Sequence, residues 1–185
     1  MLKQCSSFIL LAILLVGCHH HPRATLVQPP KTSNLPPAII TKQFTPDDDF
    51  TQVDARGHIN VNLHTGYKEA KVLLRGDPRD LERVSIKARH GKLILIMENS
   101  FPRYGAVNAD IQASTLNVFR YTGEGLITGD RLNTRYLELY LNNSGTTQLG
   151  GSIGLQILEV VGRGLTQLTG LHSYHLKIKM VGKPK

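Results

Sequence analysis

The sequence predicts an all-β domain built as a β-solenoid, and two observations support this fold class. From Phe50 onward, short runs alternate apolar and polar side chains, as in HINVNLH, and no window has the period and length of a helix. The second half also repeats: the turn-like segments TGEG, NNSG, VGRG and VGKP begin at residues 122, 142, 161 and 181. A repeat of about 20 residues is typical of coils that stack on one another.

The register of this repeat sorts the side chains into columns. One apolar column consists of Phe119, Leu139, Leu158 and Ile178. A second apolar column consists of Tyr121, Leu141, Val160 and Met180. The column between them is polar and consists of Arg120, Tyr140, Glu159 and Lys179. Two apolar columns flanking a polar one are what a strand with one buried face requires. An antiparallel β-sandwich is the alternative, but it would not explain a register kept over four segments.

The amino terminus predicts an exported lipoprotein. A lysine at position 3 precedes the apolar run FILLAILLV, which is too short to span a membrane. The end of this run, Leu15-Val16-Gly17-Cys18, resembles the lipobox of bacterial lipoproteins. We therefore expect residues 1–17 to be a signal peptide and Cys18 to carry diacylglycerol and acyl chains such as palmitate. Two or more chains hold a protein firmly on a membrane.

The expected domain organisation follows from composition. Residues 18–43 contain the lipidated cysteine and a proline-rich stretch, which favours an extended tether. Residues 44–185 form a single β domain. Because the residue after Cys18 is His19 rather than Asp, the resemblance to lipoproteins implies the outer membrane of the cell envelope. The three histidines 19–21 are interpreted as spacer rather than as a metal site.

The order of segments in the folded part indicates a family. It runs FTQVDARGHINVNLHTG, VLLRGDPRDLERVSI, GKLILIM and LNVFRYTGEG, followed by the glycine-containing coils. This order resembles the putative auto-transporter adhesin head GIN domain, over approximately residues 44–182. The resemblance implies a right-handed parallel β-helix with coils of about 20 residues, a bacterial envelope setting and no settled biochemical activity.

Catalysis is not expected. Glycan-active β-helix enzymes need paired or clustered carboxylates on neighbouring coils. The repeat half offers only four acidic residues, and the predicted register does not pair them: Glu124, Asp130, Glu138 and Glu159. We predict no metal site, and no cofactor other than the lipid on Cys18.

The remaining functional signal is electrostatic. The chain has 22 Lys and Arg against 14 Asp and Glu, and tyrosines lie among the basic residues of the second half. The predicted basic, aromatic interaction surface consists of Arg120, Arg135, Tyr136, Tyr140, Arg163 and Lys179. Such a surface suits an anionic glycan or an envelope protein, whereas the compartment argues against nucleic acid.

The function expected from these observations is a non-catalytic adhesion or interaction module held on the membrane by lipid. A structural subunit of an envelope or secretion assembly is one alternative, and a glycan-active β-helix enzyme is a less favoured one. A solenoid also ends in unpaired strand edges, so a partner that docks end-on is a further hypothesis.

Overall fold

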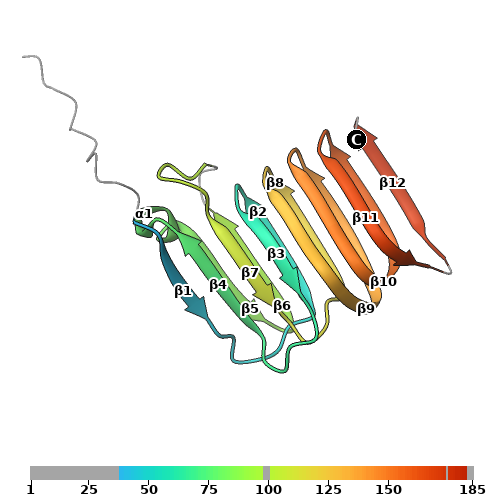
Figure 1. The fold of residues 1–185 in the computed structure, drawn as a ribbon, viewed down its shortest axis with the longest axis horizontal. Coiled ribbons are helices and arrows are strands. Elements are labelled where there is room, and N and C mark those ends of the chain that lie inside the picture. Colours follow the sequence, from blue (N-terminus) through green and yellow to red (C-terminus); the bar gives the residue numbers. More distant parts are fainter. Residues whose placement is uncertain (1–37, 98–100, 174, 183–185) are drawn as a thin grey trace, which may run out of the picture. The chain divides into compact units, whose positions relative to one another are not determined.

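The computed structural model describes residues 38–97, 101–173 and 175–182, which form one twelve-stranded sheet with one short helix (Figure 1). The predicted signal peptide, Cys18 and the tether up to residue 37 lie outside these residues. No helix within the described part of the chain is long and apolar enough to cross a membrane. The elements in chain order are β1 (Ile40–Phe44), β2 (Gln52–Gly57), β3 (Asn60–His64), β4 (Lys71–Gly76), α1 (Pro78–Leu81), β5 (Val84–Arg89), β6 (Lys92–Met97), β7 (Asn108–Gln112), β8 (Val118–Gly123), β9 (Leu126–Asn143), β10 (Thr146–Gly162), β11 (Leu165–His172) and β12 (Lys177–Gly182).

The sheet is folded into two layers, because its two longest strands take part in both. The start of β9 pairs with β3 and its end pairs with β8. In the same way, the start of β10 pairs with β11 and its end with β12. The first layer therefore contains β1, β4, β7, β3 and β11, and the second layer contains β5, β6, β2, β8 and β12 (Figure 1). Their apolar sides face each other and enclose a single core.

The expected right-handed parallel β-helix is wrong for this domain. The pairs β1–β4, β4–β7 and β5–β6 are antiparallel, so the sheet is mixed and the fold is a two-layered, barrel-like one. One cause is local: His90 and Gly91 both have positive φ, at 51° and 69°. Two such residues form the tight turn that joins antiparallel strands. Two facing layers are present, as in the sandwich alternative, but most of the strand pairs are parallel.

The predicted register of the repeat is confirmed. Phe119 is paired with Leu139, Leu139 with Leu158, and Leu158 with Ile178 across β8, β9, β10 and β12. The first three of these side chains are buried, whereas Ile178 in the last strand is 54% exposed. The column also extends in the other direction, because Val53 of β2 pairs with Phe119. The sheet begins at Ile40, four residues before the expected boundary between tether and domain.

Burial of the columns is the main source of stability. The core contains large apolar side chains with almost no exposed surface, and each contributes about 1.5–3 kcal/mol when fully buried. Tyr121 is buried with them, and its hydroxyl lies 2.9 Å from the carbonyl oxygen of Gly57 and 3.0 Å from that of Ile59. Burial raises the pKa of Tyr121 to about 12, so the hydroxyl stays a donor at all physiological pH values.

Stacked glycines form one edge of the second layer. A Cβ built on Gly145 would meet the backbone carbonyl of Gly125, and one on Gly164 would meet that of Gly145. The side chain of Asn143 lies in the same corner, where its Oδ1 accepts from the backbone N–H of Gly145 at 2.9 Å. Its Nδ2 donates to the carbonyl of Gly125 at 3.2 Å. These contacts bring successive coils close together and satisfy backbone groups that the turn leaves unpaired.

A polar clamp holds the corner around α1. Asp77 is the N-cap of this helix and accepts hydrogen bonds from the Arg79 side chain at 2.8 and 2.7 Å. The buried Asp80 accepts from the backbone N–H groups of Arg103 and Tyr104 at 2.9 and 2.7 Å, while the Arg79 guanidinium lies 3.4 Å from the centre of the Tyr104 ring. The clamp therefore fastens the segment after residue 100 to the start of the helix.

Replacing Gly145 by alanine tests the close approach of the coils. The added methyl group has no space against the Gly125 carbonyl, so the coils must separate locally. We expect a loss of about 1–3 kcal/mol in the free energy of unfolding, the range for overpacking. Urea unfolding followed by circular dichroism measures this loss. Ser144→Ala, at the exposed neighbouring position, is the control. Equal stability of the two variants would contradict the claim that the close approach of the coils requires glycine at position 145.

The clamp predicts a pH dependence of stability. The Arg79 hydrogen bonds hold the pKa of Asp77 at about 2, below the ordinary 3.8. Because the folded pKa is the lower one, the stabilisation is present at neutral pH and is lost as the pH falls from about 4 toward 2. Asp77→Asn should therefore lower Tm at pH 7, and its difference from wild type should shrink between pH 5 and pH 2. Asp130→Asn, at a highly exposed carboxylate, should show no such pattern.

Candidate functional site

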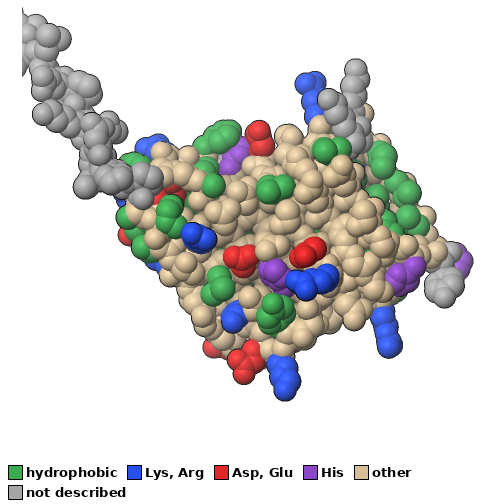
Figure 2. Space-filling view, viewed as in Figure 1, with side chains coloured by type: hydrophobic (Ala, Val, Ile, Leu, Met, Phe, Trp, Pro, Cys, Tyr) green, Lys and Arg blue, Asp and Glu red, His purple; other side chains and the backbone are tan. Residues whose placement is uncertain are grey.

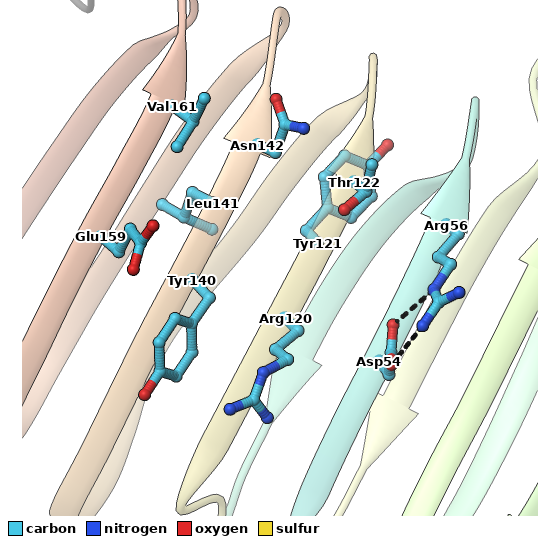
Figure 3. Close-up of a pocket in the computed structure, with 10 residues that line it drawn as sticks. All are labelled: Asp54, Arg56, Arg120, Tyr121, Thr122, Tyr140, Leu141, Asn142, Glu159 and Val161. Carbon is cyan, nitrogen blue, oxygen red and sulfur yellow. Dashed lines mark hydrogen bonds and ion pairs between the residues drawn. The ribbon is translucent and has the colours of Figure 1, made fainter. Parts of the chain in front are cut away.

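The outward-facing residues of the second layer form a continuous row across the sheet. In-register pairing places Asp54 of β2 beside Arg120 of β8, then Tyr140 of β9, Glu159 of β10 and Lys179 of β12. Figure 3 shows four of these side chains on neighbouring strands, pointing to the same side of the sheet. The predicted polar column is thus real, and we call these five residues the outer row.

One end of the outer row is a buried carboxylate held by two cations. Asp54 is only 5% exposed. It accepts two hydrogen bonds from Arg56, at 3.0 and 2.9 Å (Figure 3), and one from Lys92 at 2.9 Å. Burial raises the pKa of Asp54, but hydrogen bonds and charge from Arg56 and Lys92 outweigh it and leave the pKa below its usual value. Asp54 therefore stays ionised and fixes both cations on this face.

The middle of the outer row is a flat platform made of an arginine and an aromatic ring. The Arg120 guanidinium lies 4.2 Å from the centre of the Tyr140 ring, within the range of a cation–π contact. The Tyr140 hydroxyl donates to Glu138 at 3.0 Å. Partial burial and this hydrogen bond raise the pKa of Tyr140. The ring is therefore held at both its face and its hydroxyl.

The far end of the outer row is an exposed ion pair. Lys179 Nζ lies 2.7 Å from Glu159 Oε1, and both side chains are partly exposed to solvent. Exposed pairs of this kind contribute only about 0–1 kcal/mol. A shallow groove of about 300 Å³ runs along the row from Asp54 to Glu159, and Thr122 and Asn142 also line it.

The second layer is more basic than the first. Its outward strand positions carry seven basic residues, Arg56, Lys87, Arg89, Lys92, Arg120, Lys177 and Lys179, against Asp54, Glu138 and Glu159. On the outer side of the first layer the charged residues are Lys71, Arg75 and Arg131 against Asp110 and Asp130. Amides and hydroxyls occupy most of the rest; for example, Asn62 donates to Asp110 and accepts from Thr128, both at 3.0 Å. The two faces therefore differ in charge.

Three of the six predicted surface residues meet in this site. Arg120, Tyr140 and Lys179 belong to the outer row. Arg135 and Tyr136 lie where β9 passes between the layers, and Arg163 lies in the turn between β10 and β11. All three are exposed, but they are not part of the row.

Sequence reasoning missed the cations and the carboxylate of the first half. Asp54, Arg56 and Lys92 lie outside the repeat, and Asp54 is 66 positions before its neighbour Arg120. A signal was present in the segment QVDARG, where Asp54 stands between two apolar residues. This is the same apolar–polar–apolar pattern that Phe119, Arg120 and Tyr121 show.

Each of the four acidic residues of the repeat has a different partner. Glu124 is 4.0 Å from His58, and Asp130 is 3.6 Å from Arg131, whereas Glu138 and Glu159 interact with Tyr140 and Lys179. Within the described residues no cluster of three or more His, Cys, Asp or Glu has a metal-binding arrangement.

Two solved structures of bacterial proteins show the same fold. A putative adhesin from Bacteroides fragilis superposes with a TM-score of 0.59 at 16% identity, over 79% of this chain and 78% of that one. A putative lipid binding protein from Parabacteroides distasonis superposes with a TM-score of 0.59 at 13% identity, over 77% of this chain. The matched part spans 62% of the length of the latter protein. At these identities the likeness concerns the fold alone.

The sequence itself places the chain in a family. No curated protein matches it. The family described as putative auto-transporter adhesin, head GIN domain, matches residues 49–184. This range includes all the strands from β2 to β12. The resemblance found in the order of its segments is thereby confirmed, and the chain belongs to the family described as putative auto-transporter adhesin, head GIN domain.

Proposed function

We propose that this protein is a non-catalytic adhesion module of the cell envelope, whose outer row binds an anionic glycan. Lipid on Cys18 holds it on the outer membrane. The observation that carries the proposal is the outer row itself, in which the Arg120–Tyr140 cation–π platform and the Arg56 guanidinium line one groove on a face with excess positive charge. Membership of an adhesin family supports the setting.

The geometry of the row suits a sugar that carries carboxylates. A ring can stack beside the Arg120–Tyr140 platform, where the guanidinium presents planar donors to a carboxylate. Thr122 and Asn142 in the same groove supply the hydroxyl and amide groups that pair with sugar hydroxyls. Excess positive charge on the face attracts a polyanion before contact and speeds its association.

The arrangement of acids supports a binding role over glycan cleavage. Glycoside hydrolysis needs two carboxyl groups about 5–9.5 Å apart, one of them free to move a proton. In the row, Asp54 is held by Arg56 and Lys92, and Glu159 is paired with Lys179. These carboxylates orient cations instead of standing free beside a reacting bond.

Charge reversal on the outer row tests the ligand. Arg120→Glu combined with Lys179→Glu should weaken binding of polygalacturonate at least about tenfold, because each lost charge contact is worth about 1 kcal/mol in water. Isothermal titration at low and high salt measures this, and wild-type binding should weaken as salt increases. Arg75→Glu on the first layer is the matched control. If the protein bound neutral dextran equally well, or bound tightly only to an acidic protein, the proposal that its ligand is an anionic glycan would be refuted.

The anchor is tested separately. Replacing Cys18 by alanine removes the sulfur that would carry the lipid, so we expect the protein to leave the membrane fraction and to lose labelling by radioactive palmitate. Cys5→Ala, within the predicted signal peptide, should leave both unchanged. Persistent palmitate labelling of the Cys18 variant would show that this cysteine is not the site.

A further inference from the structure

The two layers end together at β11 and β12, and this end of the domain is open. Among the described strands, β11 and β12 each pair only with β10, so their outer edges have no strand partner. Ile178 and Met180 belong to the two apolar columns of the core, yet they are 54% and 59% exposed. Figure 2 shows apolar side chains gathered at the end where β12 lies in Figure 1. The core is therefore uncovered at this end.

The opposite end of the sheet is different. There the strand order ends at β1 and β5, and α1 lies over the corner with Leu81 only 3% exposed. The polar clamp around Asp77 fixes this corner. The β11–β12 end differs because two residues that continue the core columns, Ile178 and Met180, are each more than half exposed, and we call it the open end.

We propose that the open end binds the open end of a second copy of this chain, in a twofold-symmetric, tail-to-tail dimer. A second copy offers the same unfinished columns and the same free backbone groups. A twofold interface joins identical patches. The exposed core columns and the free strand edges of both copies would therefore gain partners in the same interface. This inference does not depend on the glycan proposed for the outer row.

The directions of the strands allow this pairing. In each copy β11 and β12 run in opposite directions along the two layers (Figure 1). A twofold axis that lies between the layers, along the strands, brings β12 of one copy beside β11 of the other. The two strands are then antiparallel, the arrangement in which backbone hydrogen bonds are perpendicular to the strands.

One register matches both faces of the two strands. If Ile178 lies opposite the partner's Leu168, then Met180 lies opposite the partner's Thr166, and both pairs point into the core. Leu168 and Thr166 are inward positions in this structure, because they pair with the buried Leu149 and Thr147. The apolar columns of the two copies would then continue across the interface.

The outward positions of this register avoid repulsion between like charges. Lys179 would lie opposite the partner's Gln167, Lys177 opposite the partner's Thr169, and Val181 opposite the partner's Leu165. Edge lysines often block pairing, but here both face uncharged side chains on the outer surface, where their ammonium groups keep their water. Apart from His172, β11 carries no ionisable residue.

Cysteine cross-linking tests the register. In the full chain with Cys5→Ser and Cys18→Ser, the pair Leu165→Cys and Val181→Cys should form a covalent dimer on mild oxidation. Within one copy these positions lie in different layers, which are about 10 Å apart, too far for a disulfide. Each single variant is a matched control and should stay uncross-linked, because the twofold axis keeps identical positions in different layers. Equal cross-linking of the single and double variants would overturn the proposed pairing.

Sedimentation measures association without cross-linking. The same cysteine-free full chain should be dimeric, and Ile178→Asp should shift it to monomer by at least a tenfold increase in Kd. Ile40→Asp, at an exposed isoleucine of β1 at the opposite end of the sheet, should leave the dimer intact, and circular dichroism confirms the fold of each variant. A chain that stays monomeric up to about 1 mM, or that forms larger polymers, would refute the tail-to-tail dimer.

Discussion

The in-register stacking of parallel strands is the constraint on which the rest of this structure depends. Each apolar column is buried only because equivalent residues of successive strands lie about 4.8 Å apart. Stacked glycines at Gly125, Gly145 and Gly164 permit that spacing, since each lies directly against the backbone of the previous coil. The same register fixes the outside of the sheet. The outer row is therefore a consequence of core packing: Arg120 and Tyr140 meet because Phe119 and Leu139 do.

The second half of the domain was predictable, and the reason is its repeat. Four copies of one pattern allowed the pairing of Leu139 with Leu158 to be read directly from the sequence, together with the neighbours of Glu159. The first half has no such copies. Its strands pair with partners far along the chain, as Asp54 does with Arg120, and alternation alone does not identify a distant partner. The three predicted residues outside the row, such as Arg163, carry a charge or an aromatic ring but do not share the register of the row.

The error in fold class has the same origin. The repeat in the second half of the chain correctly indicates parallel pairing there. It does not hold for the first half, where three of the strand pairs are antiparallel. The turn at His90 and Gly91 argues otherwise, because two successive residues with positive φ join antiparallel strands. Histidine at the first of these positions hides the signal, which is obvious only for pairs such as Asn-Gly. The antiparallel β5–β6 pair follows from this turn and makes the sheet mixed.

The outer row and the open end can act together because they use different groups of the same strand. Lys179 points outward and is held by Glu159 at 2.7 Å, so its charge belongs to the basic face. The N–H and C=O groups of β12 that an antiparallel partner would use lie in the plane of the sheet, and Ile178 and Met180 point inward. A polyanion on the face would leave all of these free. In a tail-to-tail pair the two outer rows would lie on opposite sides of the dimer, since the twofold axis exchanges the layers. Such a dimer would hold two anionic ligands that face away from each other, which is the geometry of a cross-linking adhesin.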